Sequence, residues 1–341
     1  MSDGLTYRDA GVNLEAARAA KARISGLVRG TRTKAVSSDF GSFGGRFRAT
    51  PGRELVASAD GVGTKLKVAF MADRHDTVGA DLVNHCVNDI LVEGARPLIF
   101  MDYVACGVLD PDTVTSVVTG LAAACRANGC ALLGGETAEM PDFYAPGEYD
   151  LAGFVVGEIA YPELSRRDLE AGNRLIGLAS SGIHTNGYSF ARALFFDRLG
   201  LGAHDAFPES GDSVSDVLLR PHRSYLPVLE RSLAGGRVRA LAHITGGGIP
   251  GNVDRVIGGS LDAVVRTDRW PRPHEFDVIA RESGADEAEL FSTFNMGVGM
   301  VAVVREAEAG RVLDEIRDSG CEAFICGELV AGSGRVHLEG S

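Results

Sequence analysis

The sequence predicts an α/β protein built from two compact units, and three observations lead to this prediction. Short apolar runs typical of buried strands alternate with longer segments of helical periodicity in both halves of the chain. Several of these runs stop at glycines and polar residues, as strands do before a loop. A polar stretch over residues 162–172 separates the halves, so we expect domains at residues 1–165 and 171–338.

The first half reads as strand, loop, helix, strand, helix and two more strands, after a less regular N-terminal region. The expected elements are a helix over residues 13–28, strands over 55–59, 98–105, 131–133 and 151–160, a helix from Asp81 and a helix over 111–128. Asp81 and Asp110 are plausible N-caps because their carboxylates can accept bonds from the first free N–H groups of a helix. Gly129 is expected to close the helix that begins after Asp110.

The second half repeats the alternation of strands and helices. The expected elements are a strand over 174–179, a helix over 188–199, a helical run over 253–257, a strand ending at 304, a helix over 306–319 and a strand over 322–330. Both halves therefore have the composition of a compact α/β unit.

Composition excludes some classes of function. The chain has 341 residues, 45% of them apolar, and a formal charge of −12, whereas general nucleic-acid binders are normally basic. Six cysteines occur without a C-x-x-C pair, which favours reduced thiols in a cytoplasmic protein. The N-terminus has no apolar signal segment and no apolar run reaches 18 residues, so we expect no secretion signal and no membrane span.

The stretch from Asp60 to Lys65 is the first candidate site. An apolar strand ends at Asp60, and Gly61 and Gly63 then allow a sharp turn before Thr64. A carboxylate, a hydroxyl and an ammonium beside exposed backbone N–H groups suit Mg²⁺ and the phosphates that it bridges. The pattern is not a Walker A loop. The alternative is a hairpin turn that happens to contain an Asp.

The helix expected from Asp81 has an unusual polar face. This face carries short amide, imidazole and carboxylate side chains, namely Asp81, Asn84, His85, Asn88 and, at its edge, Asp89. Asn and Asp are poor helix formers, so their presence indicates a task, although an ordinary surface helix is the alternative. A second strand ends at Gly134, Gly135 and Glu136. If the strands are neighbours, the carboxylates of Asp60, Asp89, Asp102 and Glu136 converge and need a cation such as Mg²⁺.

Two loops in the second half have the layout of phosphate-binding loops. His184, Thr185, Asn186 and Gly187 stand between a strand and a helix, and Thr245, Gly246, Gly247 and Gly248 precede another helical run. Backbone N–H groups and the helix dipole favour an anion at such positions. His184 is a candidate for positioning a phosphate or moving a proton, and a histidine that only packs in the loop is the alternative. Residues 41–47 suggest either a flap over a site or an ordinary linker.

These motifs together resemble the aminoimidazole ribonucleotide (AIR) synthetase family, the phosphoribosylformylglycinamidine cyclo-ligases of purine biosynthesis. The resemblance runs almost from end to end, through the segments 7–12, 60–65, 87–89, 134–141, 184–188, 243–248 and 294–300. The ordered series of segments is more specific than any single one. The chain departs from the family pattern at Met296, where a Cys is common, so no reactive thiol is expected there.

The resemblance implies a function and an assembly. Formylglycinamidine ribonucleotide and ATP would become aminoimidazole ribonucleotide, ADP and phosphate, through phosphorylation of the formyl oxygen. Asp60, Asp89 and Glu136 would hold Mg²⁺, Lys65 and His184 would be catalytic, and Asn88, the 61–65 turn and the two glycine loops would contact ATP or the substrate. The family also implies a homodimer in which the N-terminal sheets of two copies form a barrel.

Two other readings remain open at this point. Thiamine-monophosphate kinase, selenide-dikinase-like and hydrogenase-maturation-like enzymes share acidic, glycine-rich ATP sites but use a different second substrate. A selenophosphate enzyme is expected to carry a reactive residue near its N-terminus, whereas the first cysteine here is Cys86. A regulatory nucleotide-binding protein is expected to have lost Asp60, Lys65 or Glu136, and all three are present.

Overall fold

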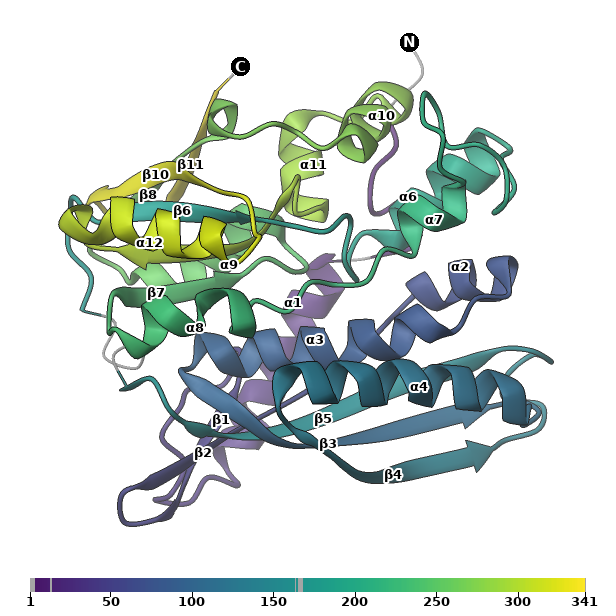
Figure 1. Cartoon of the computed structure of the whole chain (residues 1–341), viewed down its shortest axis with the longest axis horizontal. Helices are drawn as coiled ribbons and strands as arrows, with labels where there is room; N and C mark the ends of the chain where they lie inside the picture. Colours follow the sequence, from purple (N-terminus) through teal and green to yellow (C-terminus); the bar gives the residue numbers. More distant parts are fainter. Residues whose placement is uncertain (1–3, 13, 163, 165–167, 341) are drawn as a thin grey trace.

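A computed structural model describes residues 4–12, 14–162, 164 and 168–340, and it contains two β-sheets with helices packed against them (Figure 1). One sheet is formed by the N-terminal half of the chain and the other by the C-terminal half. The predicted mixed α/β class is therefore confirmed. Within the described residues, no helix combines the length and the apolar character that a bilayer crossing requires.

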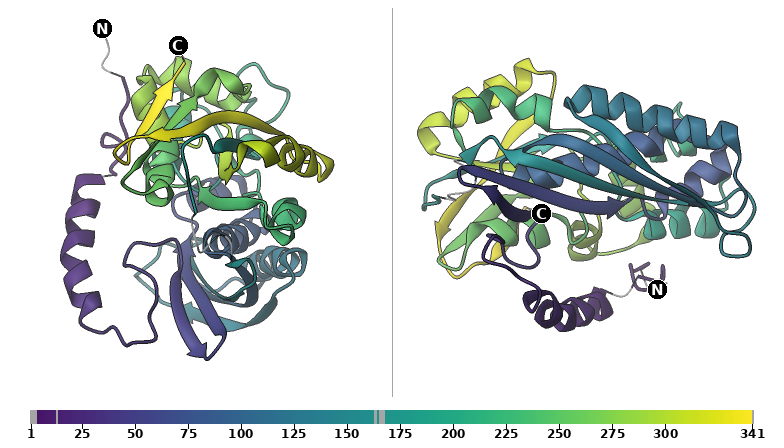
Figure 2. Two further views of the ribbon diagram at one scale, coloured as in Figure 1. Left: turned by 90° about the vertical axis from the view of Figure 1, so that its left-hand side faces the viewer. Right: turned by 90° about the horizontal axis from the view of Figure 1, so that it is seen from below.

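The N-terminal sheet has five strands in the order β1-β2-β5-β3-β4. They are β1 (Gly45–Thr50), β2 (Arg53–Gly61), β3 (Ala95–Cys106), β4 (Ala131–Glu139) and β5 (Tyr149–Ile159). Helices α3 (Asp76–Val92) and α4 (Pro111–Asn128) cover one face of this sheet (Figure 1). The other face points toward the viewer in the right-hand view of Figure 2, with none of the described helices across it.

Helices α3 and α4 approach each other closely because two glycines lie at their contact. A Cβ atom at Gly79 would lie 2.2 Å from the carbonyl oxygen of Val117, and one at Gly120 would lie 2.1 Å from that of Asp76. Any side chain at either position would push the helices apart. The pairing thus fixes the rotation of α3 about its axis, and with it the direction of its polar face.

Some predicted boundaries are confirmed and others are wrong. The Asp110 carboxylate accepts N–H bonds from the first turn of α4, and Gly129 ends that helix in the left-handed conformation, as predicted. Asp81 is not an N-cap, because α3 begins five residues earlier, at Asp76. Strand β4 extends to Glu139, so Glu136 lies within a strand rather than in a loop that follows one.

The C-terminal sheet has six strands in the order β11-β8-β10-β6-β9-β7. They are β6 (Arg174–Ala179), β7 (Val238–His243), β8 (Leu261–Arg266), β9 (Val298–Val304), β10 (Ala323–Ala331) and β11 (Val336–Glu339). Helices α8 (Leu226–Ala234) and α12 (Glu306–Asp318) lie in front of this sheet in Figure 1, and α9 (Gly248–Ile257) lies behind it. Strand β9 is buried along its whole length, as its continuous apolar sequence predicts.

The remaining elements lie around these two layers. They are α1 (Leu14–Arg29), α2 (Lys65–Ala72), α6 (Tyr188–Arg192), a π-helical turn (Ala193–Arg198), α7 (Val214–Leu218), a 3₁₀ turn (Thr267–Arg269), α10 (His274–Ser283) and α11 (Glu287–Thr293). The predicted helix over 188–199 is thus present, with a change to wider π geometry in its second half. In the left-hand view of Figure 2, α1 stands apart from both sheets.

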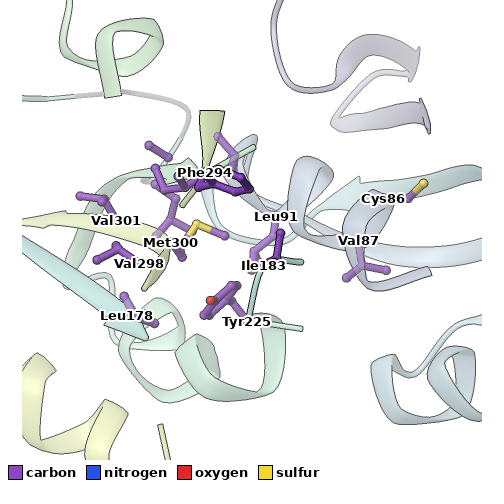
Figure 3. Packing of buried hydrophobic residues seen from close by; sticks show 14 of the residues in the cluster. Cys86, Val87, Leu91, Leu178, Ile183, Tyr225, Phe294, Val298, Met300 and Val301 are labelled. Carbon is purple, nitrogen blue, oxygen red and sulfur yellow. The ribbon is translucent and has the colours of Figure 1, made fainter. Parts of the chain in front are cut away.

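Helix α3 joins the two halves. It contacts β2, β3 and β5 of the N-terminal sheet and also β7 and α8 of the C-terminal half. Figure 3 shows Leu91 of α3 beside Ile183 and near Tyr225 of the C-terminal half, with Val87 further along α3, and all four side chains are buried. The two sheets therefore share one apolar core, and the polar residues of α3 that face the C-terminal half are buried along with it.

Candidate functional site

The amide side chains of α3 bind the backbone of the C-terminal half. The Asn84 amide donates to the carbonyl of His222 at 2.7 Å. The Asn88 amide donates to the carbonyl of Arg223 at 2.8 Å and accepts the N–H of Tyr225 at 2.9 Å. These bonds satisfy buried backbone groups that have no partner of their own in a sheet or helix. The polar face of α3 therefore serves in part to bind the C-terminal half. Asn88, which was expected to contact ATP, uses its side-chain amide for hydrogen bonds within the protein.

Lys65 is buried at the same junction and forms an ion pair with Asp81. Its ammonium lies 2.9 Å from the Asp81 carboxylate, 3.1 Å from the carbonyl of His184 and 2.8 Å from that of Arg220. Burial lowers the pKa of Lys65 and raises that of Asp81, while their mutual attraction opposes both shifts. With three acceptors and no exposed surface, the ammonium is not presented to a phosphate in this structure.

Asp60 and His85 form the next polar contact of the junction. His85 Nε2 lies 2.8 Å from Asp60 Oδ2, and the other oxygen of Asp60 accepts the N–H of Gly61 at 2.7 Å. Burial acts to lower the pKa of His85, but Asp60, with smaller contributions from Asp89 and Asp81, outweighs it and raises the pKa to about 9. Burial likewise opposes ionisation of Asp60, but His85 outweighs it and keeps the pKa of Asp60 below its usual range. This pair is therefore an imidazolium and a carboxylate at neutral pH.

A run of hydrogen bonds continues from His85 to Asp89. His85 Nδ1 lies 2.7 Å from the Thr185 hydroxyl, which lies 3.3 Å from His222 Nδ1. His222 Nε2 lies 3.0 Å from His243 Nε2, and His243 Nδ1 lies 2.7 Å from Asp89 Oδ1. Burial lowers the pKa of His243 in spite of Asp89, and it lowers that of His222 further, with help from nearby His184 and His243. His222 and His243 are therefore neutral.

His184 lies beside this run rather than at a surface. Its ring stacks on that of His222 with 4.0 Å between the centroids, and its Nε2 accepts the N–H of Ser181 at 3.1 Å. Burial holds the pKa of His184 well below its usual range. Its backbone is left-handed, with φ of 67°, which is unusual for a residue with a side chain. The Nδ1 atom of His184 has no partner among the described residues.

The two predicted phosphate loops lie side by side. A Cβ atom at Gly246 would lie 3.2 Å from Oδ1 of Asn186. Gly187 and Gly247 are both left-handed and stand immediately before α6 and α9. At Gly248 a Cβ atom would lie 1.7 Å from the carbonyl oxygen of Phe291, so only glycine fits there. The N–H groups of Gly187 and Gly248 are donated to the Tyr7 hydroxyl and the Thr245 carbonyl, so the accessible part of the paired loops consists of Asn186, Gly246 and Gly247.

The turn after β2 lies next to the C-terminal half. Gly63 and Thr64 are exposed, and the Thr64 hydroxyl lies 3.1 Å from that of Ser189 on α6. Gly63 has φ of 69°, which explains the glycine at this position. Asp60, this turn and the two glycine loops therefore border the same junction between the halves.

Within one copy of the protein, the carboxylates of Glu136 and Asp102 do not converge with those of Asp60 and Asp89. Strands β5 and β3 lie between β2 and β4, so the strands that carry Asp60 and Glu136 are not neighbours, contrary to the condition on which the prediction depended. Asp60 and Asp102 pair with the same residue, Gly153, from opposite sides. Glu136 pairs with Tyr103, one position further along, and is exposed on the opposite face.

Residues 38–45 pack against β2 and α9. The Arg255 guanidinium of α9 lies over the Phe43 ring, 3.5 Å from its centroid, and donates to the carbonyl of Gly41 at 2.8 Å. The Ser58 hydroxyl donates to the carbonyl of Phe43 at 3.2 Å and lies 3.5 Å from Asp89 Oδ2. A cavity of about 470 Å³ lies between this segment, α1 and β2. The segment is thus held between β2 and α9, close to Asp89.

Sequence reasoning missed several residues of this site. His85 was recognised as part of a polar helix face but was given no role, and neither His222 nor Arg255 was singled out. The signal for His85 was its place one helical turn before Asp89 on the same face. His222 lies in a segment without regular structure, and only the tertiary fold brings it to the other histidines.

Comparison with known proteins gives consistent results over the whole chain. Residues 16–159 match the N-terminal domain and residues 170–339 the C-terminal domain of the family described as "AIR synthase related protein". The chain is 48% identical over 333 residues to phosphoribosylformylglycinamidine cyclo-ligase of Geobacter metallireducens, covering 96% of this chain and 95% of that protein. It is 45% identical over 329 residues to the protein of the same name from Trichlorobacter lovleyi, covering 95% and 94%.

Solved structures with the same fold are more distant in sequence. Thiamine-monophosphate kinase from Stenotrophomonas maltophilia has a TM-score of 0.64 at 18% identity, covering 92% of this chain and 94% of that chain. A Thermus thermophilus protein, tt0281, has a TM-score of 0.65 at 22% identity, covering 94% and 95%. These likenesses support the fold alone. The matches to both family domains and the identity to the cyclo-ligases show that this chain belongs to the AIR synthase related family.

Proposed function

We propose that this chain is an ATP-dependent cyclo-ligase that converts formylglycinamidine ribonucleotide into 5-aminoimidazole ribonucleotide, with release of ADP and phosphate, in purine biosynthesis. The observation that carries the proposal is identity of 45–48% to proteins of that name over 95–96% of the chain. ATP phosphorylates the formyl oxygen, the amidine-side nitrogen attacks the activated carbon, and phosphate leaves. The protein has to align two anionic reactants and to offset the charge on their phosphates.

The junction between the halves supplies groups for these tasks. The exposed turn at Gly63 and Thr64 and the accessible loop residues Asn186, Gly246 and Gly247, which precede α6 and α9, would bring backbone N–H groups to phosphates. The segment over residues 38–45, held on α9 through Arg255, covers the junction near Asp89 and restricts the entry of water.

The carboxylates present fit a Mg²⁺ ion. The Asp60 side chain is 40% exposed, and both Asp60 and Asp89 lie against His85 at the junction. Oxygen ligands are those that Mg²⁺ prefers, together with phosphate oxygens of the nucleotide. We therefore propose Asp60 and Asp89 as its protein ligands, and the ion would supply positive charge to the transferred phosphoryl group. His85 and His243 are less suitable ligands, since each of their four ring nitrogens already has a hydrogen-bond partner.

The predicted catalytic residues take different roles in this proposal. Lys65 contributes indirectly, by positioning the loops of the site. Its ammonium donates to the carbonyls of His184 and Arg220 instead of facing solvent. His184 is buried and neutral, and its unpartnered Nδ1 is the atom available to accept or relay a proton. Glu136 would contribute to a metal site only across an interface, because its own chain turns it away from Asp60.

We also propose a homodimer that uses the uncovered face of the N-terminal sheet. Phe154 and Met101 are paired neighbours on this face and are 49% and 44% exposed, and Leu133 is 64% exposed. Large apolar side chains that lie together on a sheet face are typical of an interface. A second copy would cover them and would join the two N-terminal sheets, in keeping with the domains proposed at residues 1–165 and 171–338. The six free cysteines support a reducing, cytoplasmic location.

The experiment that tests the activity is ADP release from the purified protein with ATP and Mg²⁺, with and without formylglycinamidine ribonucleotide. We expect ADP release to depend on that compound and to match the aminoimidazole product mole for mole. Stimulation by thiamine monophosphate instead would keep the ATP site and overturn the substrate. ATP binding without stimulation by any acceptor would favour a regulatory protein.

A further inference from the structure

Five consecutive hydrogen bonds connect Asp60 to Asp89, and together they define a buried cluster that we name the histidine run. In order, it consists of Asp60, His85, Thr185, His222, His243 and Asp89. His85 and Asp89 belong to α3, whereas Thr185, His222 and His243 belong to three separate segments of the C-terminal half. The rings of all three histidines are buried.

The carboxylates of Asp60 and Asp89 stand at the two ends of the histidine run, and they determine which atom donates in the bonds next to them. An ionised carboxylate only accepts, so Nδ1 of His243 carries the proton that points at Asp89. Neutral His243 then has a bare Nε2, which requires His222 to donate from its own Nε2. Nδ1 of His222 consequently accepts from the Thr185 hydroxyl.

The remaining two bonds are both donated by His85, one toward Thr185 and the other in the opposite direction, toward Asp60. Because the Thr185 hydroxyl proton is used toward His222, the Thr185 oxygen accepts from Nδ1 of His85. Nε2 of His85 donates to Asp60. Each of the five bonds therefore has one donor and one acceptor, and only one arrangement of protons satisfies all of them while both carboxylates stay ionised.

His222 is the middle member and touches neither carboxylate. Removing its ring would leave Nε2 of His243 without a donor, so the His243 ring would keep only its bond to Asp89 and its orientation would be less firmly held. It would also leave the Thr185 hydroxyl without an acceptor on that side, which loosens its contact with His85. The two rings that donate to the carboxylates, His85 and His243, would therefore be held less firmly.

We propose that His222 is a positioning residue for the cation site: its two ring nitrogens hold Thr185 and His243 in place, and His85 and His243 in turn hold the carboxylates of Asp60 and Asp89 that would bind Mg²⁺. The inference rests on the proposed role of Asp60 and Asp89 as metal ligands. Groups that orient the ligands of a metal typically change its affinity by 10–100-fold when they are removed.

The test compares three substitutions at His222 in the full-length protein. His222→Leu removes both bonds, His222→Asn can reach Thr185 but not His243, and His222→Gln can present its amide where Nε2 of the imidazole stood. His204→Leu, at an exposed position, is the matched control. The readout is the Mg²⁺ concentration that gives half of the rise in melting temperature in the presence of the ATP analogue AMPPCP, together with kcat and KM for ATP.

We expect His222→Leu and His222→Asn to need about 10-fold more Mg²⁺, with kcat restored in part by high Mg²⁺. His222→Gln and the control should change the requirement by less than about twofold, in keeping with rescue of the bond to His243. An unchanged Mg²⁺ requirement in His222→Asn would overturn the positioning role. If His222→Leu does not fold, the Asn and Gln pair gives the same decision.

The underlying metal assignment is tested separately in the same assay. Asp60→Asn and Asp89→Asn should each abolish or strongly weaken the Mg²⁺-dependent rise in melting temperature. If both retain it while His222→Asn loses it, the metal ligands are misassigned and the proposal fails in its stated form. If both lose it while His222→Asn retains it, the metal site stands and only the positioning role is overturned.

Discussion

The ammonium nitrogen of Lys65 lies 2.9 Å from a carboxylate oxygen of Asp81, and neither side chain has any exposed surface. The pair stands where α2 and α3 meet the C-terminal half. Lys65 also holds the carbonyls of two C-terminal loop residues, His184 and Arg220, and Asp81 accepts the N–H of His222 at 2.6 Å. A sequence motif expected to bind phosphate is thus used to fix the two halves against each other.

Lys65→Ala should therefore reduce stability more than it affects substrate contacts. Removing one member of a buried pair leaves the other charge without compensation and typically costs about 3–5 kcal/mol. We expect a loss of that order in the free energy of unfolding by urea. The double variant Lys65→Met, Asp81→Leu should recover much of it, since no charge is left buried. A stable Lys65→Ala protein with a raised KM for ATP would instead support the direct phosphate contact.

Loss of the proton from His85 should make the metal-free protein less stable at alkaline pH. Its pKa is raised in the fold from 6.5 to about 9, so its contribution is fully present below pH 6.5 and is lost as the pH rises through about 9. The linked change is about 3 kcal/mol in the free energy of unfolding. Denaturation between these pH values, without Mg²⁺, should show this decrease in the wild type and a smaller one in His85→Gln. Parallel pH profiles for the two proteins would contradict the raised pKa.

Asn88→Leu should destabilise the junction without altering nucleotide contacts directly. It leaves the carbonyl of Arg223 and the N–H of Tyr225 buried without partners, and each unsatisfied group costs about 1–3 kcal/mol. The melting temperature should fall by several degrees, while KM for ATP measured well below that temperature should stay close to the wild-type value. A large rise in KM with an unchanged melting temperature would restore the original assignment of Asn88 to the cofactor.

Asp60→Asn should sharply lower turnover and leave the fold intact. The side chain is 40% exposed, and the substitution removes a charged ligand but keeps the size of the group. Asp102→Asn is the matched control, because Asp102 pairs with the same Gly153 from the other side and has no proposed ligand role. Turnover at limiting Mg²⁺ is the measurement. Equal activity of Asp60→Asn and the wild type under that condition would exclude Asp60 as a ligand.

Phe154→Arg should disturb the proposed dimer. The substitution places a charge in the middle of the exposed apolar face of the N-terminal sheet, next to Met101. We expect the wild type to have the mass of two chains by light scattering and the variant to shift toward one chain. Leu27→Arg, on exposed α1, serves as a control for added surface charge. A wild type that stays a monomer at all concentrations would contradict this interface.

The sequence predicted the fold class, most elements and the loops of the site, because these depend on local patterns. Short apolar runs mark β2, β6 and β9, and Asp110 marks the start of α4 by a bond within its own turn. The same patterns could not give the order of strands, which separates β2 from β4 and takes Glu136 away from Asp60. Nor could they show that the polar face of α3 is buried, since burial depends on the other half of the chain.

The histidines show that the contacts of single residues, like the order of strands, cannot be predicted from local sequence patterns. His184 lies in a recognisable glycine loop and His243 ends the strand before the other one, whereas His222 follows Pro221 in a segment with no repeating pattern. Its role depends on contacts to Thr185 and His243 that are 37 and 21 residues away along the chain. Side chains that act through such distant partners carry no local signal, and only the three-dimensional structure reveals them.

The most direct test of the account follows one oxygen atom through the reaction. Formylglycinamidine ribonucleotide labelled with ¹⁸O in its formyl group would be turned over with ATP and Mg²⁺, and the phosphate released would be analysed by mass spectrometry. We expect each phosphate to carry the labelled oxygen and to appear with one ADP and one aminoimidazole ribonucleotide. Unlabelled phosphate, with the label released into water, would contradict activation of the formyl oxygen by ATP at this site.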